Sequence, residues 1–479
     1  MNLPQDLPQD GARISVEMNT NRQKLFERFH SSDDVRTREF RLHGAQGAIL
    51  YLNAAVDRAK LQNDVLKPLL QSTEGELQDI LPILDMETAA DLEAAADGML
   101  QGKCAILLDG SAAIVLADVS ATIERSITES QNEQVIRGSH EGFVDDADMN
   151  MQLIHRRLKN PNLIERNFTL GAKSPVAVKL LYMSDIAEMT IVDEIIAKLM
   201  TNEAVFIKSP GQILNRMENS RWSLFPQMLY VERPDSTAAH LMEGRVVLLV
   251  DGSSFAVILP VTFFMFFQVA DDFNVRWWNG TFFRFLRLLS VVIGIGLPSV
   301  YIAIVSNHFE VLPIDLLFSL KASLENVPFN PLIEAMFMIT VLELLREAAI
   351  RLPKPIASTL SIVGGLVIGS EVVSAGLVST TMIVVISLTA VASFSIPSHE
   401  MRLAVRLISF PLMVAALLLG FAGIGFGFSL LFMHLSKLET FGVPYFYPFT
   451  PFEPRRILTA LIQFPKRMFS RSAKDGRAS

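Results

Sequence analysis

The chain has 479 residues, 50% of them hydrophobic, and a formal net charge of −8. This length predicts more than one domain, and the acidic balance argues against a nucleic-acid-binding protein. Cys104 is the single cysteine of the sequence, which excludes a disulfide framework and a cysteine metal site. The sequence also lacks a Walker loop, a dinucleotide-binding glycine motif and a Gly-x-Ser-x-Gly elbow. We therefore predict no enzyme, no cofactor and no metal site.

Residues 1–35 form a polar N-terminal segment. This segment has neither a basic n-region nor an apolar h-region, so we predict no signal peptide. The part of the chain before the first long apolar run is therefore expected to stay in the cytoplasm, where it is made.

Two similar hairpin signals mark the soluble part. Asp109-Gly110 and Asp251-Gly252 each lie between two apolar runs, and a further glycine stands eight residues before each turn glycine. Asp-Gly suits a tight hairpin because such turns need positive φ at their central residues. The two aspartates could be read as a pair of functional carboxylates, but we interpret them as turn residues.

We interpret the soluble part as one fold used twice. The first α/β subdomain spans residues 36–118 and the second spans residues 147–285, with a polar connector at 119–146. In each, a strand with a central tyrosine is followed by an amphipathic helix, near 56–70 and 187–200. The pattern predicts two duplicated subdomains of mixed sheet packed on helices. The alternative is two unrelated hairpins that share a common turn.

From Leu288 onward the chain becomes a series of long apolar runs. Leu288 to Ser306 carries no charge over 19 residues, enough for one bilayer crossing. We predict an all-α polytopic transmembrane domain at 286–437 and a basic cytoplasmic tail at 438–479. Four full spans are expected, at 288–306, 355–374, 378–397 and 407–434.

The segment 331–351 mixes apolar and charged residues. At 100° per residue, Glu343, Arg346, Glu347 and Arg351 share one side of a helix, while Glu334 falls on the opposite side. Glu343–Arg346 and Glu347–Arg351 have the spacing of helical ion pairs. Two interpretations stay open: an amphipathic helix in the membrane interface, or a helix that enters the membrane with its charges lining a pore or a subunit contact.

Glu371 is the only charge between Pro355 and His399. A carboxylate at the bilayer centre needs water or a partner, so Glu371 could face a pore. The alternative is that it marks a turn between two spans, near the interface. The neighbouring glycines permit either close helix packing or a break.

The distribution of basic residues predicts the orientation of the spans. Arg284 and Arg287 precede the first span, and the tail from Glu453 onward contains seven Lys or Arg against two acids. These biases place the soluble part and the tail in the cytoplasm, with the tail on anionic lipid or simply solvated. Four spans put both termini inside, but they leave the basic residues of 346–354 outside unless the preceding helix re-enters the membrane.

Dense and ordered motifs between about residues 137 and 445 resemble the GerA family of spore germination proteins. They are Arg137-Gly138, Glu141 to Val144, Arg156 to Pro161, Phe225 to Gln227, Glu232 to Asp235, Glu243 to Val246, Asp251-Gly252, Leu345 to Ala348, Arg351 to Ile356, Ser361 to Gly369 and Phe441 to Tyr445. Two departures are the stretch 201–220 and Ser374, which stands where the family pattern has an intramembrane acid.

The resemblance implies the A subunit of a nutrient germinant receptor in the inner membrane of an endospore. Its partners would be a permease-like B subunit and a lipoprotein C subunit. Self-association would form a cation channel that opens when nutrient binds. We take as candidate pore or gating residues Glu371, Glu343, Glu347, Arg346 and Glu334. The alternatives are a modulatory stage V sporulation paralogue and a non-conducting membrane scaffold for germination proteins.

Overall fold

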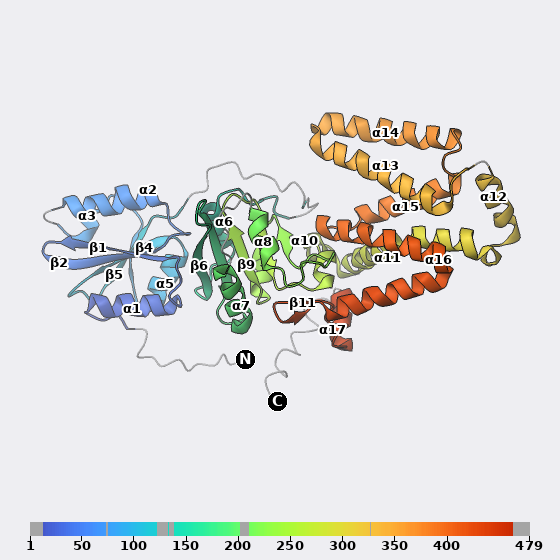
Figure 1. The fold of residues 1–479 in the computed structure, drawn as a ribbon. Helices are drawn as coiled ribbons and strands as arrows, with labels where there is room; N and C mark the ends of the chain where they lie inside the picture. Colours follow the sequence, from blue (N-terminus) through green and yellow to red (C-terminus); the bar gives the residue numbers. More distant parts are fainter. Residues whose placement is uncertain are drawn as a thin grey trace. The chain divides into compact units, whose positions relative to one another are not determined.

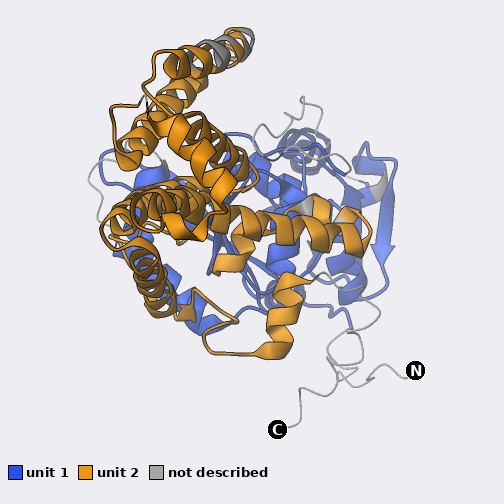
Figure 2. Cartoon of the chain, turned by 90° about the vertical axis from the view of Figure 1, so that its right-hand side faces the viewer, with its two compact units in different colours: residues 1–219, 228–260 blue, residues 220–227, 261–479 orange. Residues whose placement is uncertain are grey.

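The computed structural model describes residues 13–72, 75–121, 133, 138–201, 210–325 and 327–462. The chain forms two compact units: an α/β unit of residues 1–219 and 228–260, and a helical unit of residues 220–227 and 261–479 (Figure 2). Most of the predicted connector, part of the departing stretch 201–220, and the tail from 463 onward lie outside the described residues.

The first half of the α/β unit is a five-stranded sheet with the order β1-β2-β4-β5-β3 (Figure 1). In chain order its elements are α1 (Met18–Arg28), β1 (Val35–Leu42), β2 (Ala45–Leu52), α2 (Arg58–Lys60), the π-helical turn η1 (Leu61–Leu66), α3 (Lys67–Gln71), α4 (Leu77–Ile80), β3 (Met86–Ala89), α5 (Leu92–Leu100), β4 (Lys103–Leu108) and β5 (Ile114–Asp118).

Helices cover both faces of this sheet because successive side chains of a strand point to opposite faces. Leu107 of β4 packs in one core with Leu25 of α1 and Met99 of α5. Cys104 of the same strand points to the opposite face and packs in a second core with Val65 of η1. Cys104 is fully buried, as predicted, and burial raises the pKa of its thiol to about 12.

The second half of the α/β unit has the equivalent strand order, β6-β7-β9-β10-β8. Its elements are α6 (Ala147–Arg157), β6 (Leu163–Leu170), β7 (Val176–Met183), α7 (Met189–Met200), α8 (Pro210–Met217), β8 (Leu229–Val231), α9 (Pro234–Met242), β9 (Val246–Val250) and β10 (Ala256–Leu259).

The two halves share local contacts as well as strand order. Asn21 of α1 is buried, and its side chain accepts from the Ser15 N–H at 2.8 Å and donates to the Ser15 carbonyl at 2.6 Å. Asn150 of α6 makes the same two bonds with Val144, at 2.8 and 2.6 Å. This is the arrangement that the duplication hypothesis predicts, and it places α1 in the first repeat, ahead of the predicted start at residue 36.

The predicted hairpins are present between β4 and β5 and between β9 and β10. Gly110 and Gly252 adopt positive φ values of 86° and 78°. Asp109 accepts from the Met18 N–H through its side chain, and Asp251 accepts from the Ala147 N–H, each at 3.3 Å. Both aspartates are therefore turn residues. Each also binds the backbone at the start of the first helix of its repeat, α1 or α6.

The prediction of mixed sheets is wrong on one point, because the described strands pair only in the antiparallel sense. β3 and β4 run in the same direction and are joined through α5, as in a parallel α/β fold. However, β5 lies between them, and β10 lies between β8 and β9 in the second sheet. In each sheet, an antiparallel strand therefore lies between the two parallel strands that the helix connects.

The helical unit begins earlier than the predicted boundary of 286, since the aromatic turn η2 (Phe263–Phe267) packs on the aromatic residues Tyr445 and Phe446. Its further elements are α10 (Ala270–Asn274), α11 (Trp277–Asn307), η3 (Phe309–Val311), α12 (Ile314–Leu324), α13 (Pro331–Arg351), α14 (Lys354–Ser374), α15 (Thr380–Phe394), α16 (His399–Lys437), β11 (Glu439–Thr440), β12 (Val443–Pro444) and α17 (Pro454–Leu461).

Among the described helices, α11 and α16 are long and apolar enough to cross a membrane. Helix α13 has the range predicted for the mixed segment. The Asn330 side chain accepts from the Ile333 N–H at its start, and Pro353 follows its end. The predicted span 378–397 contains only the 15-residue helix α15.

Helix α16 is not the single straight span predicted at 407–434. Gly420 has φ 61° and ψ −138°, which breaks the helix. A Cβ at Gly423 would collide with the Ala415 carbonyl, and one at Gly427 would collide with Leu412. Residues 412 and 427 would lie about 22 Å apart in a straight helix. The chain therefore folds back at Gly420, which gives a first arm of residues 399–419 and a second arm of residues 421–437 (Figure 1).

Candidate functional site

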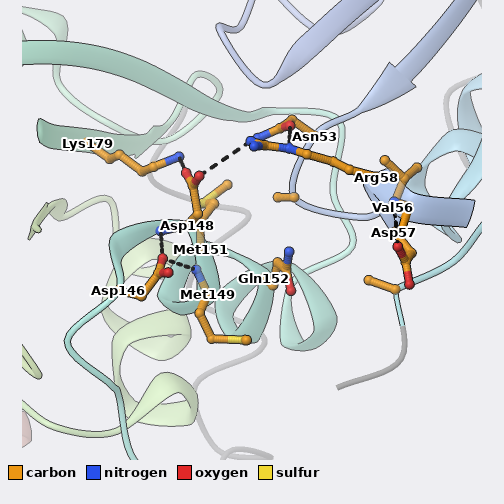
Figure 3. A pocket seen from close by; sticks show the side chains of 13 residues that line it. Asn53, Val56, Asp57, Arg58, Asp146, Asp148, Met149, Met151, Gln152 and Lys179 are labelled. Atoms are coloured by element: carbon orange, nitrogen blue, oxygen red, sulfur yellow. Dashed lines mark hydrogen bonds and ion pairs between the residues drawn. The ribbon is translucent and has the colours of Figure 1, made fainter. Parts of the chain in front are cut away.

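A polar cleft opens between the two halves of the α/β unit (Figure 3). Its volume is about 300 Å³, which is within the usual range for small-molecule sites. One wall is formed by the segment that follows β2, including Asn53 and Arg58. The other wall is formed by the start of α6 and by β7, including Asp148 and Lys179.

Four charged side chains form a chain of ion pairs across this cleft. Lys179 Nζ lies 2.8 Å from Glu165 Oε1 and 2.7 Å from Asp148 Oδ1. Arg58 Nη2 reaches Asp148 Oδ2 at 3.4 Å from the opposite wall (Figure 3). Lys179 and Glu165 are buried, whereas the side chains of Asp148 and Arg58 are half exposed or more. The cleft therefore connects a buried ion pair to an exposed one.

The loop between α1 and β1 docks on the edge strand β6 and joins the halves. The Asp33 N–H donates to the Glu165 carbonyl at 2.9 Å, and the Glu165 N–H donates to Ser32 Oγ at 2.9 Å. Asp34 follows in this loop, is buried, and accepts from the Ala54 N–H at 2.8 Å. Burial, reinforced by the nearby charge of Glu165, raises the pKa of Asp34 to about 7.

Lys179 and Asp148 stabilise each other in their charged forms. Burial alone would lower the pKa of Lys179, but the charges and hydrogen bonds of Glu165 and Asp148 raise it. Burial alone would raise the pKa of Asp148, but the hydrogen bond and charge of Lys179 lower it. A cleft that presents a carboxylate and a guanidinium side by side suits a small polar ligand that bears groups of both signs.

Sequence reasoning did not identify this cleft. Lys179 carries the one available signal, since a lysine in the middle of the apolar strand β7 needs a buried partner. That partner, Glu165, lies on the adjacent strand, and Asp34 comes from the other half of the unit. In the part of the chain that the structure describes, no group of three or more His, Cys, Asp or Glu is placed to hold a metal ion.

In the helical unit, α11, α13, α15 and α16 pack together, and the two ends of this bundle differ in their residues. At one end, Glu334 of α13 is fully buried and its Oε2 accepts from the Ser379 N–H at 2.9 Å. Tyr301 donates to or accepts from Thr381 Oγ1 at 2.8 Å, and Asn307 donates to the Ala416 carbonyl at 3.1 Å. We call this the Glu334 end.

The opposite end carries a cluster of arginines. Glu343 and Arg346 of α13 pair at 3.2 Å, and Arg406 of α16 pairs with the same carboxylate oxygen. The Arg346 guanidinium also lies 5.0 Å from the ring centre of Phe394, at the end of α15. Arg402 lies one turn before Arg406. We call this the arginine end, defined by Glu343, Arg346, Arg402 and Arg406.

The structure thus separates the five candidate pore or gating residues. Glu343 and Arg346 share one cluster, while Glu334 lies buried at the opposite end of α13. Glu347 pairs with Arg351 on the exposed side of α13, with Arg351 Nε 2.9 Å from Glu347 Oε1. Glu371 is exposed in the last turn of α14, so it stands near the end of that helix rather than at its middle.

These features define the class of the protein: a duplicated α/β unit joined to a helical unit whose longest helices can cross a membrane. A model of the family described as Bacillus/Clostridium GerA spore germination protein matches residues 23–474. Spore germination protein A1 of Bacillus subtilis is 34% identical over 439 residues, which cover 91% of this chain and 91% of that protein. The chain therefore belongs to the GerA spore germination family.

Other relatives cover similar lengths. Spore germination protein KA of Bacillus subtilis is 33% identical over 94% of this chain and 85% of its own length. The membrane protein YfkQ of the same organism is 32% identical over 94% of this chain and 90% of its own length. Among solved structures, the N-terminal domain of the A subunit of the Bacillus megaterium spore germinant receptor GerK3 matches with 21% identity and a TM-score of 0.41, over 52% of this chain and 97% of that domain.

Proposed function

We propose that this protein is the A subunit of a nutrient germinant receptor in the inner membrane of an endospore. The observation that carries the proposal is the similarity to spore germination proteins over nearly the whole chain. A permease-like B subunit and a lipoprotein C subunit are the partners that this role implies. The α/β unit faces the cytoplasm in this arrangement.

Six crossings, rather than the four expected from sequence, reconcile the helical unit with the distribution of charge. Helices α11, α13, α14, α15 and the two arms of α16 alternate in direction between the arginine end and the Glu334 end (Figure 1). The junctions α13–α14 and α15–α16 then face the cytoplasm together with the C-terminus. The basic residues Arg351, Lys354 and Arg402 thereby fall on one side, as the positive-inside rule requires.

The receptor subunit self-associates and forms a pore for monovalent cations. Glu347 and Glu371 are the acidic candidates that project from the helical unit, on α13 and α14 respectively. A ring of such carboxylates from several subunits would favour cations. Glu334 is buried within its own subunit, and Glu343 is neutralised by two arginines, so both fit a gating role better than a lining role.

A bilayer experiment tests the pore. Reconstituted receptor complexes that carry Glu371→Gln or Glu347→Gln are expected to lose cation selectivity, because the ring loses its charge. The matched control is Glu310→Gln, which removes an exposed acid within η3. Selectivity and conductance that stay unchanged in both lining variants would reject these residues as pore residues.

The cleft of the α/β unit supports a second binding role, for a small polar molecule. Arg58→Gln is expected to reduce the response of spores to such a molecule, because it removes the guanidinium that faces Asp148. Arg22→Gln breaks a surface pair with Glu39 away from the cleft and serves as the control. An equal response in both variants would argue against the cleft.

The alternative functions are a modulatory stage V sporulation paralogue and a non-conducting membrane scaffold. The similarity to YfkQ is compatible with both alternatives, because the name of YfkQ states a membrane protein and no germination role. A scaffold would remain electrically silent in the bilayer experiment, whereas a modulatory paralogue would alter responses to every nutrient.

A further inference from the structure

The arginine end carries more positive charge than its own carboxylate can balance. Arg346 and Arg406 share one oxygen of Glu343, and among the described residues no ion pair involves Arg402. Three guanidinium groups therefore face a single carboxylate. Like charges this close together repel each other, so a counter-charge from outside the chain would stabilise this cluster.

The arginines also have unused donors. The Nε atoms of Arg402 and Arg406 are buried, and neither has a hydrogen-bond partner in the part of the chain that the structure describes. The Arg406 side chain is only 15% exposed. A buried donor of a charged group that makes no bond is costly, so the described residues leave the hydrogen-bonding capacity of these arginines unsatisfied.

We propose that the arginine end binds the phosphate headgroup of an anionic phospholipid. The planar fork of a guanidinium matches a phosphate group bidentately, and the Phe394 ring lies against Arg346. The proposal rests on the six-crossing arrangement, in which these residues lie at headgroup depth on the cytoplasmic side, where anionic lipids bind basic pockets. It does not depend on channel activity.

The space beside the cluster favours lipid over a soluble ligand. The cavity that Glu343, Arg346 and Arg406 border has a volume of about 30 Å³, with walls of mostly apolar residues from α11, α13, α15 and α16. That is room for about one water molecule. A free metabolite cannot be enclosed there, whereas a headgroup can reach the guanidinium groups from the surface of the bundle.

Native mass spectrometry of the full chain in nanodiscs tests the site. The nanodiscs contain phosphatidylcholine alone or an equimolar mixture of phosphatidylcholine and phosphatidylglycerol, and the measured quantity is the number of each lipid retained. The wild-type protein is expected to retain phosphatidylglycerol preferentially. Arg402→Gln with Arg406→Gln is expected to weaken this retention about fivefold per arginine.

Arg351→Gln is the matched control, because Arg351 lies near the same end of α13 but is exposed and paired with Glu347. It is expected to retain phosphatidylglycerol as the wild type does. If the double glutamine variant fails to fold, Arg402→Lys with Arg406→Lys keeps the charge without the fork and is expected to show a smaller loss. Unchanged retention in a folded glutamine or lysine pair would overturn the proposal.

Inorganic phosphate distinguishes the two possible sources of the anion. Added at excess, it is expected to leave the retained phosphatidylglycerol in place, because the headgroup is held by its membrane anchor. Displacement of the lipid by phosphate, with binding of phosphate in nanodiscs of phosphatidylcholine alone, would assign the site to a soluble anion and overturn the lipid proposal.

Discussion

At the scale of single residues, the informative groups are charges that the fold has buried. Lys179 and Glu165 pair with each other inside the α/β unit, and burial, together with the charge of Glu165, raises the pKa of Asp34 to about 7. In the helical unit, Glu334 is buried as the acceptor for the start of α15. Each of these groups lies at a contact between different elements, so its ionisation or removal acts on that contact.

Asp34 is expected to make the junction between the two halves sensitive to pH. Its pKa is raised from 3.8 to about 7, so the folded state holds a proton that the unfolded state has lost. The free energy of unfolding therefore falls as pH rises from about 4 to about 7, by up to about 4 kcal/mol. Asp34→Asn removes this loss, so hydrogen exchange of the full chain should show stronger protection of β1 in the variant than in the wild type at about pH 8.

The comparison must be made between variant and wild type at each pH, because His155 titrates in the same window with the opposite sign. Burial lowers the pKa of His155 to about 4, so its contribution is lost as pH falls. At about pH 5 the protection of Asp34→Asn and wild type should coincide. A variant that is less protected than wild type at about pH 8 would contradict the account.

Glu334 is expected to act as a hydrogen-bond acceptor rather than as an exposed charge. Glu334→Ala leaves the Ser379 N–H without its acceptor inside the bundle and should cost about 1–3 kcal/mol. Glu334→Gln keeps an acceptor oxygen and should cost less. Thermal unfolding of the full chain in detergent gives the comparison, with Glu347→Ala on the exposed side of α13 as the control. Equal losses from Glu334→Ala and Glu347→Ala would refute the assignment.

Some of these residue contacts could be predicted from the sequence and others could not. The pairs Glu343–Arg346 and Glu347–Arg351 follow from the spacing of a helix and are present in the structure. The cleft could not be predicted, because Arg58 and Asp148 come from different halves of the unit. The second partner of Glu343 was missed for the same reason, since Arg406 lies on another helix.

At the scale of elements, local sequence signals located the helices and hairpins but not the direction of the chain within α16. The glycines at 420, 423, 425 and 427 are compatible with close helix packing as well as with a turn. Whether the chain turns back or continues as a helix depends on tertiary contacts, in which Asn307 donates to the carbonyls of Ala416 and Leu417. Those contacts hold the end of the first arm against α11, where no local pattern could place it.

The fold-back at Gly420 predicts a large difference between two glycine substitutions in the same helix. Gly420→Ala forces a side chain into φ 61°, where it would also collide with His308, and should destabilise the helical unit by roughly 1–3 kcal/mol or more. Gly425 has open space around its Cβ position, so Gly425→Ala should be neutral or slightly stabilising. The midpoint of thermal unfolding in detergent measures both. Equal midpoints for the two variants would mean that α16 does not fold back at this residue.

At the scale of the whole molecule, the number of crossings decides which residues each side of the membrane can reach. Six crossings place Arg351 in the cytoplasm and Glu371 outside, whereas the four crossings expected from sequence place them the other way round. The apolar segments expected at 288–306 and 407–434 lie in α11 and α16, the described helices that are long and apolar enough to cross a membrane. The sequence did not indicate the two further crossings that we propose, because α13 carries four charges on one side and the turn of α16 at Gly420 lies within an apolar run.

Cysteine labelling separates the two arrangements. The single native cysteine, Cys104, is buried and is replaced by serine. Single cysteines then take the place of Arg351 and Glu371, with Glu310 as a marker of the outside and Arg456 as a marker of the cytoplasm. A membrane-impermeant maleimide added to intact cells should label the cysteines at 310 and 371 but not those at 351 and 456. Labelling at 351 and not at 371 would restore the four-crossing arrangement.

The central claim is that this GerA-family chain is a receptor subunit that couples a nutrient to cation release. The most direct measurement is potassium release from dormant spores with the gene present or deleted, across a panel of nutrients. The account predicts that deletion abolishes release for one class of nutrient and leaves the others unchanged, and that the wild-type gene restores it. Release that is unchanged for every nutrient in the deletion strain would contradict the account.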